Sequence, residues 1–284
     1  ISGDGFVDGQ GASYEFTGEQ LEKGSSENKF TYMLNAGTQA SNYEINIVFG
    51  TLEITALDIS AVSEEEIRVV LGPALTYTGL EQNQTVASVM YNSLVVDYSV
   101  LGNQATDAGD YNLTITGQGN FTGSIIYPWE ILPKELKLTA GSGNKVYDGV
   151  ELTIADVKAE GFVANQGATF TCDGSQTDVG SSANNVETIM WKANTKGSNY
   201  KVTKLPGVLT VTERAITLTA PTKTKPYDGT ELSFDSSEIM IGGLGFVAGE
   251  GFSYSNYSSI TEAGQTPSTF TYVADAQTKL SNYS

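Results

Sequence analysis

The sequence predicts an all-β protein built from small domains in tandem, and an immunoglobulin-like sandwich is the favoured fold of each domain. Three observations support this prediction. Short motifs recur about every eighty residues, several segments alternate apolar and polar residues as half-buried strands do, and helical periodicity is nearly absent. A small sheet of the β-grasp type is the alternative fold, and the lack of a convincing helix favours the sandwich.

Three short motifs define the repeating unit. Gly-Phe-Val occurs at 5–7, 161–163 and 245–247, Tyr-Asp-Gly at 147–149 and 227–229, and Ser-Asn-Tyr at 41–43, 198–200 and 281–283, with a diverged copy of the last at Gly119-Asn120-Phe121. A unit of this length has the size of a small domain and is too long for one turn of a solenoid. The motifs therefore predict separate domains in a row.

The motif spacing divides the chain into four repeats: the first repeat at residues 1–57, the second at 58–134, the third at 135–213 and the fourth at 214–284. The first starts midway through the unit and the fourth stops before its expected closing strand, so we expect an excerpt from a longer array. Only Thr212-Glu213-Arg214 separates the third repeat's closing strand from the next opening strand. Such a short connection predicts an extended, semi-rigid rod.

Within the repeats, the pattern is strand, turn, strand. The clearest alternation lies in six segments: Phe30 to Met33, Val95 to Val100, Tyr111 to Ile115, Leu136 to Thr139, Val208 to Val211 and Ile216 to Thr219. The one hint of a helix is the Ser followed by three Glu at 63–66. Because Ile67, Val69 and Leu71 then alternate, we predict that this segment leads into a strand.

One local pattern favours the sandwich. Thr106-Asp107-Ala108-Gly109-Asp110-Tyr111 has the Asp, Gly, Tyr spacing found where a sandwich strand starts after a corner. In such corners the tyrosine hydroxyl bonds to backbone a few residues upstream. The related segments Thr177 to Gly180 and Thr261 to Gly264 lack a Tyr two residues on, so we predict the corner for the second repeat alone.

Composition excludes several classes of function. The chain has 15 Lys plus Arg against 33 Asp plus Glu, no His and one Cys, for a formal charge of −18. This charge repels phosphate backbones and anionic headgroups, so neither nucleic acid nor a membrane surface is an expected partner. Counting alone excludes imidazole catalysis, His metal sites and intrachain disulfides. No apolar run approaches the roughly 20 residues of a membrane-spanning helix.

The motifs resemble those of a known family. In the third repeat, Lys145 to Gly149, Gly161-Phe162-Val163, Ser198-Asn199-Tyr200 and Gly207 to Thr212 are similar to the YDG and MBG repeats of large bacterial surface proteins. The second repeat, with Leu75 to Gly79, resembles the sister type whose signature is Tyr-x-Gly. The resemblance covers essentially the whole chain. It implies tandem β-domains of secreted, adhesin-like or stalk-like proteins, and it brings no catalytic residues.

Acidic residues are the first candidates for chemistry. Asp4 and Asp8, in Gly3 to Gly9, suggest a calcium loop, because Ca²⁺ takes several oxygen ligands. The corresponding stretches of the third and fourth repeats have neither Asp, so we interpret both as turn residues. Close carboxylate pairs for glycoside hydrolysis are compatible with the composition. A domain of about eighty residues has little room for an enclosing cleft, so we predict no catalytic residues, metal or cofactor.

Aromatic residues are the candidates for sugar stacking. Trp129 and Trp191 align with inward strand positions of the other repeats, which predicts core packing. Tyr14 and Tyr254 share one repeat position and are assigned to the scaffold. Tyr257 has no such counterpart, and it is the one residue predicted to contact a glycan.

Two further hypotheses concern a cysteine and a pair of lysines. Cys172 lies in a strand-like segment, where a lone Cys is usually a small buried hydrophobe. Lys145 and Lys225 recur two residues before the Tyr of Tyr-Asp-Gly, and an Asn recurs in every Ser-Asn-Tyr. A Lys–Asn cross-link of the kind that stabilises surface stalks is therefore one hypothesis. The second repeat has Leu75 at the Lys position, which argues against a general cross-link.

The sequence therefore predicts a non-enzymatic structural or adhesive stalk segment of a bacterial cell-surface protein, located outside the cell. Its expected partners are neighbouring repeats, and host glycans, mucin or matrix proteins where a binding region is presented. A glycan- or mucin-binding adhesin module is the first alternative. A carboxylate-based glycoside hydrolase is the second.

Overall fold

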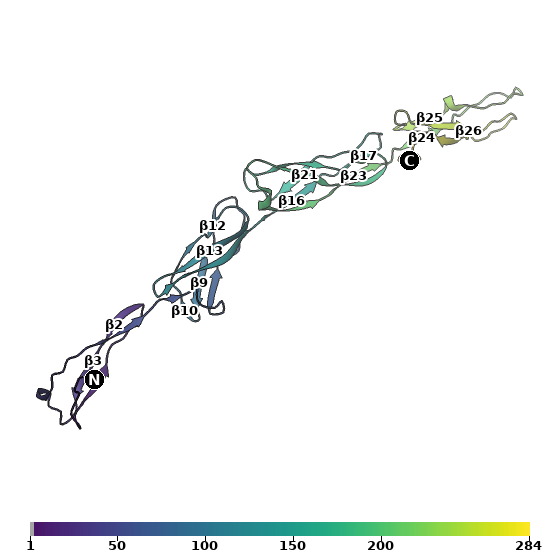
Figure 1. Ribbon diagram of the computed structural model, residues 1–284. Helices are drawn as coiled ribbons and strands as arrows, with labels where there is room; N and C mark the ends of the chain where they lie inside the picture. Colours follow the sequence, from purple (N-terminus) through teal and green to yellow (C-terminus); the bar gives the residue numbers. More distant parts are fainter. Residues whose placement is uncertain (1–2) are drawn as a thin grey trace. The chain divides into compact units, whose positions relative to one another are not determined.

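Strands form nearly all the regular structure of the computed structural model, which describes residues 3–284 (Figure 1). The helices in this described part are four single 3-10 turns: η1 (Ala40–Asn42), η2 (Gly197–Asn199), η3 (Ser236–Glu238) and η4 (Leu280–Asn282). The all-β prediction is confirmed. The chain divides into two compact units, of which the first ends at Pro133 and the second is Lys134–Ser284.

In the first repeat, two antiparallel ladders are formed. They pair β1 (Ala12–Phe16) with β3 (Phe30–Leu34), and β2 (Gly24–Asn28) with β4 (Gly50–Ile54). Residues 43–49, which begin with the tyrosine of the Ser-Asn-Tyr motif, are not in a strand.

The second repeat has the most complete sheet of the first unit, in the order β11-β13-β15-β7, and a smaller sheet in the order β10-β9-β6. Two short pairs, β12-β8 and β14-β5, complete it. Its strands are β5 (Leu57–Asp58), β6 (Ile67–Leu71), β7 (Leu75–Thr76), β8 (Gln82–Asn83), β9 (Val86–Tyr91), β10 (Leu94–Val95), β11 (Tyr98–Leu101), β12 (Gln104–Ala105), β13 (Gly109–Gly117), β14 (Phe121–Thr122) and β15 (Ser124–Leu132).

The third repeat contains sheets ordered β18-β16-β22 and β17-β23-β20, together with the β19-β21 ladder. The opening strand β16 is parallel to β22, and β17 is parallel to β23. The strands are β16 (Lys134–Ala140), β17 (Gly143–Val146), β18 (Val157–Glu160), β19 (Ala168–Cys172), β20 (Gly180–Asn184), β21 (Val186–Trp191), β22 (Tyr200–Leu205) and β23 (Gly207–Thr212).

The fourth repeat has two antiparallel ladders, which pair β24 (Ile216–Thr219) with β25 (Met240–Gly243) and β26 (Phe252–Ser255) with β27 (Thr271–Ala274). A single parallel bridge joins Arg214 to Tyr283. This bridge occupies the place of the parallel contact that β16 and β22 make along their length in the third repeat, where Lys134 stands opposite Tyr200.

The cores follow the alternation in the sequence. In β16, Leu136 and Leu138 are fully buried, and in β23 so are Leu209 and Val211. Side chains of a strand point alternately to opposite faces, so the intervening Lys and Thr residues lie outward. Fully burying one such side chain stabilises the fold by about 1.5–3 kcal/mol.

Five of the six predicted strand segments lie in strands. The exception is Val95 to Val100, which is divided between β10 and β11. These two strands belong to different sheets, and between them Val96 is 1% exposed and donates its backbone hydrogen to Val89 O at 3.0 Å. The segment is extended as the alternation predicts, but the chain passes from one sheet to the other within it.

Two local predictions are confirmed. Residues 64–66 form a turn and β6 begins at Ile67, with the Ser63 hydroxyl donating to Glu66 at 2.9 Å. The Tyr111 hydroxyl donates to the backbone oxygen of Asp107 at 2.8 Å. The second repeat thus contains the tyrosine-to-backbone bond that the spacing indicated.

Candidate functional site

The third and fourth repeats meet at the Ser-Asn-Tyr motif of the fourth. Asn282 is fully buried, and its Oδ1 atom accepts a hydrogen bond from the backbone of Val179 at 2.9 Å. Its Nδ2 atom donates to Asp178 Oδ1 at 2.9 Å, and its backbone oxygen accepts from Arg214 at 2.9 Å. One asparagine therefore connects a turn of the third repeat to the first residue of the fourth.

The first and second repeats meet in the same way. The Oδ1 atom of Asn120 accepts from the backbone of Lys23 at 2.7 Å, and its Nδ2 atom donates to the Glu22 carboxylate. The backbone oxygen of Asn120 accepts from Leu57 at 2.9 Å. We call each of these arrangements an Asn joint: Asn282 with Asp178 and Val179, and Asn120 with Glu22 and Lys23.

The turn that receives the asparagine has the form acid-x-Gly. Gly180 has φ 142° and Gly24 has φ 136°, a region of backbone conformation that favours glycine. Gly180 pairs with Val211 and Gly24 pairs with Ile54, near the end of each closing strand. The turn therefore lies where the chain leaves one repeat and enters the next.

Tyr147, of the Tyr-Asp-Gly motif, extends the contact between the third and fourth repeats. It is 5% exposed, and its ring packs edge-on against Tyr283 with centroids 5.7 Å apart. The two hydroxyls donate to the two oxygens of one carboxylate, that of Glu250, each at 2.5 Å. The hydrogen bond to Glu250, with burial, raises the pKa of Tyr147 to about 12.

Arg214 completes this contact from the connection between the repeats. Its guanidinium donates to Gly245 O at 2.6 Å and to Leu244 O at 2.5 Å in the fourth repeat, and to Tyr147 O at 3.3 Å in the third. Three carbonyls from two repeats thus share one planar donor group, which limits rotation about the short connection.

An ion pair lies at the edge of the same joint. Lys279 donates to Asp178 Oδ2, while Asn282 occupies Oδ1 of the same carboxylate. The bond from Lys279, and next that from Asn282, hold the pKa of Asp178 below its usual range. The lysine and the aspartate come from different repeats, so the ionised form of Asp178 favours their contact.

The Gly-Phe-Val and Ser-Asn-Tyr motifs form one structure inside each of three repeats. The tyrosine hydroxyl accepts from the backbone of the valine and donates to the side chain three residues after that valine. The pairs of distances are 3.2 and 2.6 Å for Tyr43, 3.0 and 2.5 Å for Tyr200, and 3.0 and 2.5 Å for Tyr283. This arrangement fixes the loop that carries the asparagine.

The residues considered for calcium lie in exposed turns, with Asp4 in a bend and Asp8 in the turn that ends at Gly9, φ 78°. Within residues 3–284, no group of three or more Asp, Glu or Cys side chains has the arrangement of a metal site. Glu64 to Glu66 form an exposed or half-exposed turn.

The tryptophans pack as the alignment predicts. Trp129 is 5% exposed, lies 4.9 Å from the ring of Tyr111 and donates its Nε1 hydrogen to Gly102 O at 3.1 Å. Trp191 is half-buried and stacks on Tyr200 with centroids 5.9 Å apart.

Tyr257, the candidate for glycan contact, is half-buried. Its ring packs against Phe234 at 5.4 Å, and its hydroxyl donates to the backbone oxygen of Tyr254 at 2.9 Å. These contacts give Tyr257 a packing role in the fourth repeat, and its contact with a glycan stays a prediction.

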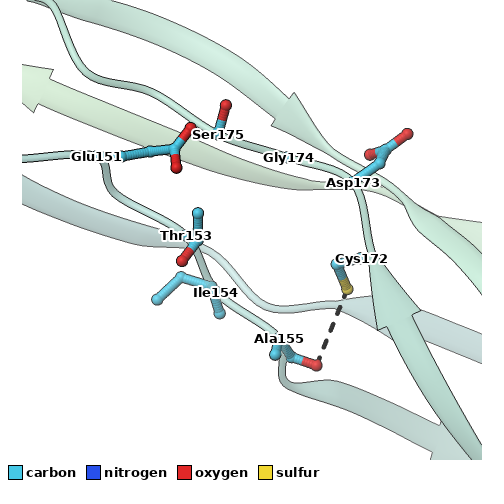
Figure 2. A pocket seen from close by; sticks show the side chains of 8 residues that line it. All are labelled: Glu151, Thr153, Ile154, Ala155, Cys172, Asp173, Gly174 and Ser175. Atoms are coloured by element: carbon cyan, nitrogen blue, oxygen red, sulfur yellow. Dashed lines mark hydrogen bonds between the residues drawn. The ribbon is translucent and has the colours of Figure 1, made fainter.

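Cys172 borders a shallow pocket of about 410 Å³ in the third repeat (Figure 2). Its Sγ atom points to the carbonyl of Ala155 at 4.0 Å, and the carboxylates of Glu151 and Asp173 lie at opposite ends of the pocket. Burial, with the charge of Asp173, raises the pKa of the thiol. The thiol is therefore protonated at neutral pH, which does not suit a nucleophile.

The two lysines of the cross-link hypothesis have aspartate partners. Lys145 Nζ lies 2.6 Å from Asp148, and Lys225 Nζ lies 2.9 Å from Asp228. The Asn282 amide bonds to Asp178 instead of a lysine. The geometry thus gives each lysine the role of closing its own Tyr-Asp-Gly turn.

The sequence patterns do not predict the Asn joint. The Ser-Asn-Tyr motif and the segment Thr177 to Gly180 are recognisable separately, whereas Glu22-Lys23-Gly24 belongs to none of the recurring motifs. Their partnership joins residues 103 positions apart, Val179 and Asn282, and no pattern of local periodicity reports such a distance. The one sequence signal for the joint was the recurrence of an asparagine in the Ser-Asn-Tyr motif.

Comparisons with protein-family models, with curated protein sequences and with solved structures found no match to this chain. No helix in the described part is both long enough and apolar enough to cross a membrane.

Proposed function

We propose that this chain is a non-enzymatic stalk segment of a bacterial cell-surface protein, in which immunoglobulin-like repeats form an extended rod that spaces or presents a binding region. The observation that carries the proposal is the Asn joint, which occurs in both units of the chain with an equivalent acid-x-Gly turn as its partner. A fixed joint is what a spacer needs, because a swivelling connection would not hold a constant length.

The joints favour a mechanical role over a chemical one. Their polar groups bond to one another: Asn282 to Val179 and Asp178, and Tyr147 and Tyr283 to Glu250. Groups paired in this way strengthen a contact between domains and leave few donors for a substrate. The contacts of Tyr257 do not favour the glycan-binding alternative over the spacer. The cell-surface location rests on the resemblance of the motifs and agrees with the acidic charge of −18, which keeps separate rods apart.

Small-angle X-ray scattering on the full chain tests the proposal. We expect the scattering of a stiff rod, and a more flexible particle when both joints are weakened in the double variant Asn120→Ala/Asn282→Ala. The matched control is Asn42→Ala/Asn46→Ala, in which two exposed asparagines of the first repeat are changed. Flexible-chain scattering from the unmodified protein would refute the rod. Saturable binding to mucin or glycans, abolished by Tyr257→Ala, would replace the spacer with the adhesin alternative.

A further inference from the structure

In the third repeat, the strands that open the repeat run parallel to the strands that close it (Figure 1). β16 pairs with β22 over six residue pairs, of which the first is Lys134 with Tyr200, and β17 pairs with β23 over four, of which the last is Val146 with Thr212. Partners are 66 positions apart from the first pair to the last. We call this contact the parallel ladder, and it keeps one register although both sides change sheet partway along.

The change of sheet does not interrupt the parallel ladder, because other contacts bridge it. The Ser142 hydroxyl accepts the backbone hydrogen of Val208 at 2.9 Å. The side-chain amide of Asn184, which is fully buried, donates to the backbone oxygen of Gly141 at 2.9 Å. Gly207 passes so close to Gly141 that a Cβ atom on Gly207 would lie 2.1 Å from that oxygen. The opening and closing sides are therefore in contact from one end of the ladder to the other.

Tension along the chain loads this ladder in its strongest direction. The chain enters the ladder at Lys134 and leaves it at Thr212, and these residues lie at opposite ends of two parallel sides. Pulling on them slides one side past the other and loads the evenly spaced hydrogen bonds together. Pulling both sides from the same end would open the bonds one after another. Sliding therefore has the higher barrier to unfolding, and this barrier governs forced unfolding.

The second repeat, which also lies between two others, has only short pieces of such a ladder. β5 pairs in parallel with β14 over two residue pairs, and β7 pairs in parallel with β15 over two more. Between these contacts the opening side runs from Asp58 to Leu75, and the closing side runs only from Thr122 to Ile131, so the register is not kept. The longer opening side contains β6, whose one strand partner within the described residues is β9.

We infer that the third repeat is a mechanical clamp that carries tension along the chain, and that the second repeat is an extensible element that unfolds first and lengthens the stalk. The inference rests on the proposed stalk role for the source of the tension. The difference in strength lies inside each of the two repeats and involves none of the Asn joints. A stalk of this kind lengthens before its clamp yields, which limits the force on a binding region that it presents.

Single-molecule force spectroscopy on the full chain tests the inference. DNA handles are attached to pairs of cysteines at exposed positions, in a Cys172→Ser background. Handles at Glu135→Cys and Glu213→Cys make the parallel ladder slide. Handles at Glu135→Cys and Lys201→Cys, which stand opposite each other, open the same ladder from one end. Handles at Thr55→Cys and Glu135→Cys load the second repeat.

We expect the third repeat to unfold at a force at least about twofold higher when its ladder slides than when the ladder opens from one end. We also expect the second repeat to unfold at a lower force than the sliding third repeat at the same loading rate. The two placements on the third repeat load the same fold, so their difference reports the direction of the force. Equal forces for these placements, or a second repeat as strong as the third, would overturn the inference. Either result, obtained together with the scattering of a stiff rod, would leave the stalk proposal standing.

Discussion

Asn282 accepts the backbone hydrogen of Val179 across a repeat boundary, at 2.9 Å and over a sequence separation of 103 residues. Asn120 makes the same bond to Lys23 at 2.7 Å, over 97 residues. The two bonds lie in different units of the chain and are formed by different flanking sequences. What they share is an asparagine whose side chain reaches an acid-x-Gly turn, so this pair of features defines the joint.

Removing the asparagine should loosen one joint and leave the repeats folded. Asn282→Ala removes the hydrogen bonds to the half-buried Val179 N–H and to the Asp178 carboxylate, and a lost hydrogen bond costs about 0.5–1.5 kcal/mol, or more where one partner is charged. We expect faster amide exchange at Val179 by tenfold or more, with the exchange of Leu136 and Leu138 unchanged. Asn42→Ala, at an exposed copy of the same motif, is the control and should alter neither. Unchanged exchange at Val179 would show that the bond does not hold the joint.

The two Tyr-Asp-Gly tyrosines should respond differently to loss of the hydroxyl. Tyr147 is 5% exposed and donates to Glu250, while Tyr227 is 65% exposed. Tyr147→Phe should lower the free energy of unfolding of the fourth repeat by about 1–2 kcal/mol, because the Glu250 oxygen loses a partner. Tyr227→Phe should change it by less than about 0.5 kcal/mol, as an exposed surface substitution does. Urea titrations of both variants, followed by tryptophan and tyrosine fluorescence, compare them directly, and equal effects would contradict the assignment.

The contact between the third and fourth repeats should weaken in alkali. The pKa of Tyr147 is raised from 10.0 to about 12, so the folded state favours the neutral phenol. The stabilisation that the neutral Tyr147 hydroxyl gives to the contact is complete below about pH 10 and is lost as the pH rises towards 12. Amide exchange cannot be followed well at such pH, so we would measure the distance between spin labels on the two repeats. A widening between pH 10 and 12 is expected, and Tyr147→Phe should remove the part that depends on this group.

The same contact should also weaken in acid. Lys279 and Asn282 hold the pKa of Asp178 below 3.8 in the folded protein. The ionised carboxylate therefore stabilises the contact at pH values above the pKa of the unfolded chain, and this stabilisation is lost as the pH falls through the lower pKa of the folded state. Lys279→Met should move the loss of contact to higher pH, because the first cause of the lowered pKa is removed. Lys29→Met, which changes an exposed lysine of the first repeat, serves as the control. Identical acid profiles for the two variants would exclude Lys279 from the joint.

The sequence predicted the strands better than the contacts between repeats, and the reason is physical. The alternation at Leu136 and Leu138 indicates which face of a strand is buried, and this can be recognised from residues that are adjacent in the sequence. The corner at Tyr111 was predicted because its hydrogen bond spans four residues. The Asn joint depends on two turns about one hundred residues apart. A polar turn residue looks the same in a sequence whether it faces water or another domain, so the repeated Asn and the repeated Asp or Glu gave no sign of their pairing.

Replacing Arg214 even with lysine should weaken the contact between the third and fourth repeats. The chain has two arginines, and this one bonds to Gly245, Leu244 and Tyr147 carbonyls, which lie on both sides of the connection. A lysine at this position keeps the charge, but its single ammonium group cannot reach the three carbonyls that the planar guanidinium contacts. Arg214→Lys should therefore cost about 1–2 kcal/mol in the joint, from the bonds that are lost, and should broaden the distance distribution between spin labels on the third and fourth repeats. The control is Arg68→Lys, at an exposed position of β6 in the second repeat, which should leave that distribution unchanged. Because both variants conserve charge, a difference between them isolates the guanidinium geometry, and equal distributions would show that the connection is held by the Asn joint and the tyrosine pair alone.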